Sequence, residues 1–421
     1  MIEERSQSII NQLKQLYPDF IIGTAASAHQ VEGNNENDWT LFENKIGTIK
    51  NNDKSGKACN HYELYKDDFR DLSELGFSAH RLSIEWSRIF PKIDVISQSA
   101  IEHYRQVLSE LKRLGLQSFV TLHHFTSPIW FMELGGFEKT KNLIHWKKFV
   151  ELICQELGNL IDVFNTINEP FVYASTGYLN GIHSPGKKSL IKYFYVSNNL
   201  MRAHFQAVEI IRKICKDKPV GLVKNLAVFK NRRRNPIDWI ITKIFDLGYN
   251  KIPLNSLKRK KIPFGFSRIK EGDMGDFLGI NYYLIMEIGL GLPYFMNFFI
   301  SGDSNLTQMG WGVYPYGLAE VLLRAYKITS LPLYVTENGI ATEDDKWRIE
   351  FILDHLDSMI NAMNNKVDVR GYFYWSNIDN FEWSEGFKPK FGIIEVDYST
   401  FSRTTKESGK LLGSIAKFLR S

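Results

Sequence analysis

The chain has 421 residues, of which 44% are hydrophobic, 24% charged and 14% aromatic, and its formal net charge is +5. This composition is ordinary for a soluble globular protein, and so small a charge without a basic stripe argues against nucleic-acid binding. The length allows either two or three average domains or one large α/β barrel.

Strand-like and helix-like segments alternate along the whole chain. The candidate strands are short β-branched or apolar runs, at residues 20–24, 80–85, 118–122, 163–168, 220–224, 277–282, 333–337 and 371–375. Between them lie amphipathic stretches such as 349–363, where apolar residues recur at spacings of three and four and predict one buried helix face. No linker rich in Pro, Gly or Ser divides the series. The sequence therefore predicts an α/β fold, a single (β/α)8 TIM barrel over residues 1–421.

Two glutamates stand where predicted strands end. Glu169 follows the fourth strand and Glu337 ends the seventh, and a buried carboxylate without a partner is costly enough to need a use. The carboxyl ends of barrel strands form the catalytic face, so we expect both glutamates there. The same rule predicts that further strand-end residues converge on this mouth, namely Arg81, Glu85, Trp86, His123, His124, Asn281, Tyr282, Tyr283 and Trp375.

This set of side chains favours glycoside hydrolysis. The sequence has no H-x-x-x-H or H-E-x-x-H frame for a metal and no serine nucleophile elbow. A glycosidase needs one protonated and one ionised carboxyl group. Arg81 and Tyr283 are suited to hold Glu337 ionised, whereas apolar surroundings would keep Glu169 protonated near neutrality. Each glutamate taken alone also fits a plain helix-start or turn acid.

Six stretches match the motifs of a known family in that family's order. They are S-A-H-Q-V-E-G at 27–33, H-R-L-S-I-E-W-S-R-I at 80–89, T-I-N-E-P at 166–170, G-W-G-V-Y-P at 310–315, T-E-N-G at 336–339 and W-S-N-I-D-N-F-E-W at 375–383. The chain thus resembles the family 1 glycoside hydrolases, the (β/α)8 group of retaining β-glycosidases that includes the β-glucosidases. The resemblance implies double displacement on a β-linked glycoside, with no metal and no cofactor.

The resemblance also implies residue roles. Glu169 would be the acid/base and Glu337 the nucleophile, with catalytic support from Arg81, Tyr283 and Asn281. The expected substrate-binding residues carry aromatic or hydrogen-bonding side chains, and they are Gln30, His124, Asn168, Trp311, Trp375, Glu382, Trp383 and Phe391. Trp375 would be the stacking floor under the sugar. A catalytically dead sugar-binding or protein-binding barrel is the rival interpretation, but both glutamates stand in intact motifs.

The sequence departs from the family pattern in two places. His124 is followed by Phe125, where the family usually has Trp, so a ring donor to the sugar is lost. Residues 229–275 match the family poorly. Glu382 occupies a position where phospho-sugar members carry a small residue, and a carboxylate would repel a phosphate. We therefore expect a neutral sugar, most simply glucose, with galactose, fucose or mannose tolerated, and keep a 6-phospho-β-glycosidase as the alternative.

Location is predicted from the cysteines and from the amino-terminal residues. Cys59, Cys154 and Cys215 are odd in number and lack C-x-x-C spacing, which favours a reducing compartment. The acidic first residues lack the features of a secretory signal. We expect a cytoplasmic protein.

An apolar tract at 284–300 follows the sixth strand, and it is too short and too polar to span a bilayer. An amphipathic segment at 239–245 lies between basic runs at 232–234 and 258–261. Together these features predict a hydrophobic aglycone and peripheral contact with the inner face of the membrane. The alternative is that both apolar stretches pack on the barrel and that the basic runs are solvated loops.

Overall fold

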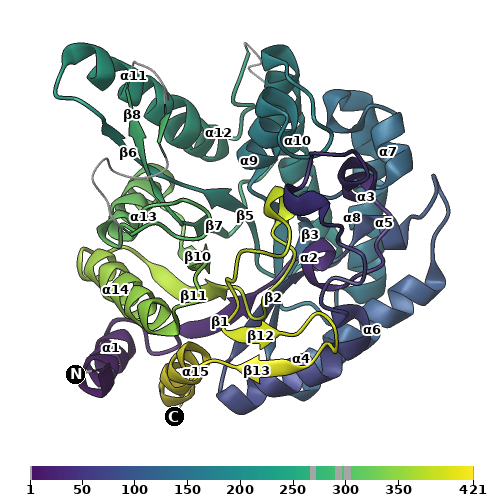
Figure 1. The fold of residues 1–421 in the computed structure, drawn as a ribbon. Helices are drawn as coiled ribbons and strands as arrows, with labels where there is room; N and C mark the ends of the chain where they lie inside the picture. Colours follow the sequence, from purple (N-terminus) through teal and green to yellow (C-terminus); the bar gives the residue numbers. More distant parts are fainter. Residues whose placement is uncertain (1, 266–271, 290–295, 298–304, 421) are drawn as a thin grey trace.

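The computed structural model describes residues 2–265, 272–289, 296–297 and 305–420, and its centre is a closed barrel of eight parallel strands (Figure 1). Around the barrel the strands follow in the order β1, β2, β3, β4, β5, β7, β10 and β11. Their bounds are Ile21–Ala25 (β1), Ala79–Ser83 (β2), Gln117–His123 (β3), Val163–Asn168 (β4), Val220–Asn225 (β5), Phe277–Asn281 (β7), Leu333–Asn338 (β10) and Val369–Trp375 (β11). The predicted (β/α)8 barrel is confirmed.

All eight predicted strands are present, and no end differs from its prediction by more than two residues. The agreement has a simple cause: these strands are buried on both faces, so each reads as a nearly continuous apolar run. The second strand is the largest departure at a carboxyl end, because it stops at Ser83. Glu85 instead begins the helix α5 (Trp86–Ile89), where its side chain accepts a hydrogen bond from the backbone N–H of Ser87.

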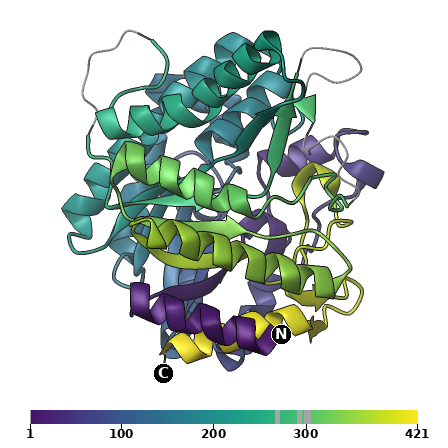
Figure 2. The ribbon, with the colours of Figure 1, turned by 90° about the vertical axis from the view of Figure 1, so that its left-hand side faces the viewer.

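Helices surround the barrel. The longer ones are α1 (Ile2–Leu16), α4 (His61–Leu75), α6 (Gln98–Arg113), α8 (Leu143–Leu157), α10 (Leu190–Ile214), α11 (Pro236–Asp246), α12 (Ile252–Arg259), α13 (Tyr316–Thr329), α14 (Asp345–Asn364) and α15 (Glu407–Arg420). The short helices are α2 (Ala28–Val31), α3 (Asp38–Glu43), α7 (Ile129–Glu133), α9 (Pro170–Ala174), η1 (Lys50–Asn52), η2 (Gly136–Glu138), η3 (Thr140–Asn142), η4 (Ser175–Asn180), η5 (Leu247–Lys251) and η6 (Trp383–Glu385). Figure 2 shows that α1 and α15, at the two ends of the chain, lie side by side.

Aromatic residues fill the interior of the barrel below its mouth. Phe119 of β3 and Phe373 of β11 pack with their ring centroids 4.5 Å apart, and Phe277 of β7 packs against Tyr334 at 5.1 Å. These rings belong to one buried cluster with Ala79 and other strand residues. Because the lower barrel is packed with apolar side chains, the polar residues of the strands gather at the carboxyl ends.

A second, small sheet extends beside the barrel. It pairs β6 (Val228–Asn231) with β8 (Ile285–Ile288) and β8 with β9 (Met296–Asn297), while β12 (Ile394–Val396) pairs with β13 (Arg403–Thr405) elsewhere. Residues 284–289 are buried at this sheet beneath α11, so the packed alternative is correct for this first part of the tract, because β8 hydrogen-bonds on both edges. Residues 290–295 and 298–300 lie outside the described residues. Among the residues that are described, no helix is both long and apolar enough to cross a membrane.

Candidate active site

Glu169 lies at the mouth of the barrel, directly after β4. Its backbone has a φ of 44°, a region that few residues other than glycine adopt. The side-chain Oε1 accepts hydrogen bonds from the Nδ2 atoms of Asn281, at 2.7 Å, and Asn225, at 3.1 Å. Burial, and next the charge of Glu337, raise the pKa of Glu169 to about 7. Since both amides occupy Oε1, the proton of the acid form belongs on Oε2.

Glu337 faces the same space from β10, with a different set of partners. Its Oε2 accepts a hydrogen bond of 2.7 Å from the hydroxyl of Tyr283, and its Oε1 pairs with the guanidinium of the fully buried Arg81. Burial and the charge of Glu337 hold the pKa of Tyr283 well above its usual value, so this phenol remains a donor. A cation and a hydroxyl donor on the two oxygens favour a carboxylate with a fixed orientation.

The glycine of the T-E-N-G motif, Gly339, is required at its position for a steric reason. A Cβ on Gly339 would lie 1.7 Å from the backbone oxygen of Trp375, so no larger residue fits between β10 and β11 here. The close approach brings the end of β11, and with it Trp375, beside Glu337's strand.

Arg81 also determines how the next two side chains are oriented. Its Nη2 donates to Oδ1 of Asn168 at 2.8 Å, so Nδ2 of Asn168 is the atom that lies 3.1 Å from Nε2 of His124. That imidazole nitrogen must therefore accept, and the ring proton is on Nδ1. Burial keeps the pKa of His124 well below its usual value, so the ring is neutral. Nδ1 is buried and has no partner among the residues that the structure describes, which leaves an N–H donor for a ligand.

Asn281 connects Glu169 to this series of hydrogen bonds. Its Oδ1 accepts from the hydroxyl of Thr336 at 2.7 Å, which directs Nδ2 to Glu169 and, at 3.2 Å, to Oδ1 of Asn168. The predicted support residue is thus in direct contact with the acid.

Gln30 and Glu382 meet on the opposite wall of the mouth. Nε2 of Gln30 donates to Oε2 of Glu382 at 3.2 Å and to Oδ1 of Asn380 at 2.9 Å. Burial, followed by the charge of Glu337, raises the pKa of Glu382 to about 8, against hydrogen bonds from Trp375 and Gln30. The dependence on Glu337 indicates that Glu382 and Glu337 share one electrostatic environment.

Aromatic rings border the site on two sides. Trp375 and Trp383 both lie nearly parallel to the ring of His124, with centroids 5.8 and 6.2 Å away. On the side of Glu337, Tyr283, Trp311 and Phe391 form a triangle with centroid distances of 5.7, 6.1 and 6.4 Å. All of the predicted substrate-binding residues therefore lie near the two glutamates.

The prediction that every strand-end residue points into the mouth is wrong for four of them. Trp86 stacks on Phe149, and His123 packs on Phe137, so both rings lie among the surrounding helices. The hydroxyl of Tyr282 donates to the backbone oxygen of Tyr314, and Glu85 accepts from the hydroxyl of Thr126. His123 and Tyr282 each stand next to an inward-facing residue, and successive side chains of a strand alternate between its two faces. Glu85 and Trp86 lie beyond the end of β2 at Ser83, so the strand does not direct them into the mouth.

Phe125, at the departure from the family pattern, sits beside the sugar-binding candidates. Its ring centroid is 5.2 Å from that of Trp383, and its φ is 70°. Two acids from other loops hold the adjacent turn, because Asp38 accepts from the backbone N–H of Ser127 and Glu85 from Thr126. The substitution therefore presents an apolar ring at a firmly held position.

Three residues around Glu169 escaped the sequence analysis. Asn225 ends β5 one residue beyond the predicted strand end, so following that strand to its last residue would have found it. Lys224 precedes it and is buried, and Tyr249 of η5 donates to Oδ1 of Asn225 at 2.6 Å. Tyr249 lies in the stretch that matches the family poorly, and no local pattern indicates its place.

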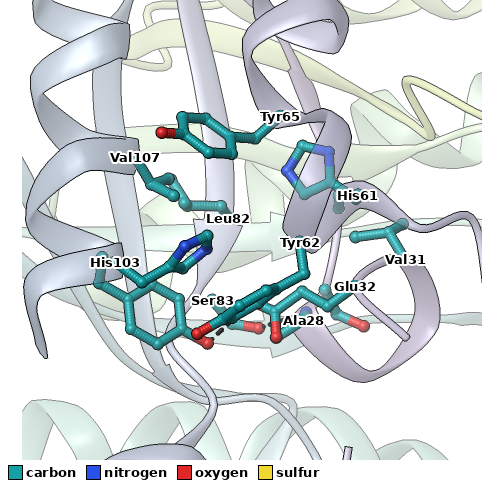
Figure 3. Close-up of a pocket in the computed structure, with 13 residues that line it drawn as sticks. Ala28, Val31, Glu32, His61, Tyr62, Tyr65, Leu82, Ser83, His103 and Val107 are labelled. Atoms are coloured by element: carbon teal, nitrogen blue, oxygen red, sulfur yellow. Dashed lines mark hydrogen bonds between the residues drawn. The ribbon is translucent and has the colours of Figure 1, made fainter. Parts of the chain in front are cut away.

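A cavity away from the glutamates does not belong to this site. It lies between α2, β2, α4 and α6 and is lined by residues that include Glu32, Tyr62, Ser83 and His103 (Figure 3). Its volume of about 10 Å³ suits a single water molecule rather than a sugar ring. Within the described ranges, no group of three His, Cys, Asp or Glu side chains is arranged to hold a metal ion.

Known proteins resemble the chain over almost its whole length. The family described as "Glycosyl hydrolase family 1" matches residues 12–419. Beta-glucosidase A of Thermotoga maritima is 31% identical over 96% of this chain and 98% of its own. The structure of a beta-glycosidase from Pyrococcus horikoshii superposes with a TM-score of 0.88, with 42% identity over 95% of this chain and 94% of its own. The structure of a Thermotoga maritima beta-glucosidase in complex with glucoimidazole superposes with a TM-score of 0.89, with 30% identity over 95% of this chain and 98% of its own.

Proposed function

We propose, from the premise that the chain belongs to glycosyl hydrolase family 1 and is a retaining β-glycosidase, that Glu169 and Glu337 carry the reaction. The observation that supports this most is their contrasting environments: Glu337 is held by Arg81 and a phenol, whereas Glu169 is held by two neutral amides. We also propose that residues 1–421 form one catalytic domain.

The proposed reaction takes two displacements at the anomeric carbon. In the first, Glu337 forms a bond to that carbon while the bond to the aglycone oxygen breaks and this oxygen takes the proton from Oε2 of Glu169. In the second, Glu169 removes a proton from water, the water oxygen bonds to the carbon, and the ester to Glu337 breaks. His124, Asn168, Gln30, Glu382 and Trp383 would bind hydroxyls of the nonreducing sugar above Trp375, with Trp311 and Phe391 at its edge.

A neutral sugar fits the wall formed by Gln30 and Glu382. The hydrogen-bond partners of Glu382 are the side chains of Gln30 and Trp375, both uncharged. A phosphate dianion needs a cation there. Below pH 8 Glu382 offers it at most one hydrogen-bond donor, and above pH 8 its negative charge repels the phosphate.

We expect nitrophenyl β-glycosides of neutral sugars to be cleaved with a kcat/KM at least about 100-fold above that of their 6-phosphates, because placing like charges together costs several kcal/mol. A panel of glucosides, galactosides, fucosides and mannosides, with and without the 6-phosphate, measures this. Faster cleavage of the phosphorylated compounds would establish the 6-phospho-β-glycosidase alternative, and no cleavage of any would remove the glycosidase assignment.

The aglycone side of the site is apolar. Tyr283, which donates to Glu337, and Trp311 pack against a buried cluster of Ala227, Leu284, Met286 and Ile288. Ile241 and Phe245, on the inner face of α11, pack against the same cluster. This continuous apolar wall supports a hydrophobic aglycone.

The outer face of α11 supports the proposed contact with the inner leaflet of the membrane. Large apolar side chains there are about half exposed, from 50% for Ile240 to 61% for Ile244, with Trp239 and Ile237 between. Lys258 and Arg259 are exposed nearby in the chain, whereas Arg232 and Arg233 pair with Glu287 and Asp238. Exposed apolar residues beside cations suit an anionic bilayer surface. The three free cysteines support the proposed intracellular location.

We expect the protein to sediment with vesicles containing anionic phosphatidylglycerol at low salt, and the double variant Ile240→Glu, Ile244→Glu to lose this binding while its kcat on nitrophenyl glucoside stays unchanged. The control is Ile46→Glu, since Ile46 is an equally apolar side chain, 93% exposed, on a different loop. Long alkyl glucosides should also have a higher kcat/KM than cellobiose. Equal sedimentation of all three proteins, or none by the wild type, would leave α11 without this role.

A further inference from the structure

Lys224 is a buried cation next to the proposed acid/base. It is the penultimate residue of β5 and only 1% exposed. Its ammonium donates to the backbone oxygen of Asn225 and lies over the rings of Tyr249, at 4.1 Å, and Phe171, at 5.6 Å. No carboxylate among the described residues forms an ion pair with it. A buried ammonium without an ion pair is rare in proteins and is a mark of functional sites.

A single residue, Asn225, connects the surroundings of Lys224 to Glu169. The Asn225 backbone oxygen accepts from Lys224, and its side-chain Oδ1 accepts from Tyr249 at 2.6 Å. Nδ2 of Asn225 is thereby directed to Oε1 of Glu169 at 3.1 Å. Burial holds the pKa of Tyr249 well above its usual value, so its hydroxyl stays a donor. Lys224 therefore holds the main chain of Asn225, and Tyr249 holds its side chain.

Charges of opposite sign face Glu169 from two strands. Glu337 on β10 disfavours the carboxylate form of Glu169, and Lys224 on β5 favours it. Arg81 on β2 pairs with Glu337 and contacts Asn168, while Tyr283 and Tyr249 are neutral phenols. Burial lowers the pKa of Lys224 to about 7, and the charge of Glu169 opposes that decrease. Ionisation of Glu169 therefore favours the ammonium form of Lys224.

We propose that Lys224 is a positioning residue for the reaction, which stabilises the carboxylate that Glu169 becomes after protonating the leaving group and, with Tyr249, keeps Asn225 aligned to it. This inference rests on the proposed role of Glu169. Lys224 exchanges no proton with the substrate: the proton passes from Glu169 to the aglycone oxygen and returns to Glu169 from water. Its effect is to make Glu169 a stronger acid.

The test is the pH profile of kcat/KM for an alkyl β-glucoside. Without the cation, Glu169 stays protonated to higher pH, so Lys224→Met should move the alkaline limb upward by about one pH unit, the lower end of the effect of a nearby opposite charge. Lys224→Arg keeps the charge and should keep the limb near its wild-type position. Tyr249→Phe retains the ring under the ammonium but removes the donor to Asn225, and should move the limb in the same direction by less.

A purely structural role predicts another result. If Lys224 only fills space, Lys224→Met lowers kcat/KM equally at all pH values and leaves the limb in place, which would overturn the proposal. If that variant does not fold, as judged by thermal unfolding, an unmoved limb in Tyr249→Phe overturns it instead. Failure of the underlying assignment looks different, because Glu169→Ala would then keep the alkaline limb of the wild type.

Discussion

Glu337→Gly is expected to lower kcat for every β-glycoside by about 10⁵-fold, the order of decrease in rate that follows removal of a nucleophile when the rest of the site remains. The reason is geometric. Arg81 and Tyr283 hold both oxygens of this carboxyl, and no other carboxylate in the described part of the chain has these partners. Glycine removes the side chain and leaves a space that a small anion can enter. Azide should therefore restore part of the turnover, measured by release of nitrophenol.

The control for this variant is Glu343→Gly, which makes the same substitution at an exposed position six residues further along the chain, beyond the end of β10. It should hydrolyse at the wild-type rate. Retained turnover in Glu337→Gly, or a similar loss in Glu343→Gly, would contradict the assignment of the nucleophile.

Glu169→Ala should separate substrates by their leaving groups. A general acid contributes about 10²- to 10⁴-fold, and only where the departing oxygen needs a proton. Alkyl glucosides should therefore lose about 10³-fold in kcat/KM, whereas 2,4-dinitrophenyl glucoside, whose leaving group is a weak base, should lose little in this first step. Stopped-flow measurement of dinitrophenol release gives the second value, and steady-state hydrolysis of an alkyl glucoside gives the first.

The pH dependence of the same reaction follows from the environment of Glu169. Burial and the charge of Glu337 raise its pKa to about 7, and the first displacement needs the protonated form. As the pH rises through 7 the protonated fraction falls, so kcat/KM of the wild type on alkyl glucosides should fall with it. Glu169→Ala has no such group and should show a flat profile there. Equal losses on both classes of substrate, or an unchanged alkaline limb, would count against Glu169 as the acid.

The sequence was sufficient for the barrel and for the position of two glutamates at its mouth. Strands such as β4 and β10 are buried on both faces, so β-branched and apolar residues run without interruption until the chain reaches the mouth. The first ionisable residue after such a run is conspicuous, which is why Glu169 and Glu337 could be identified before any contact was known. Their partners on β2 and β7 followed from the same rule.

The errors and omissions come from information that a linear pattern does not hold. Which of two neighbours at a strand end faces inward depends on where the strand stops, and β2 stops two residues early, so Trp86 turns outward. Tyr249 reaches Asn225 from η5, 24 residues away, without any periodicity to indicate it. The segment at 239–245 is recognisably amphipathic, but only the packed structure shows that Ile241 faces the small sheet of β6 and β8 and that Ile240 faces outward.

The assignment of roles to the two glutamates is tested most directly by the anomeric configuration of the products that the two variants form with azide, read by proton NMR. In Glu337→Gly azide takes the place of the nucleophile and attacks once, so a β-glucoside should give the α-glucosyl azide. In Glu169→Ala azide takes the place of water in the second displacement, so the same substrate should give the β-glucosyl azide. The opposite pair of products would exchange the two roles, and the same configuration from both variants would contradict the double displacement at this site.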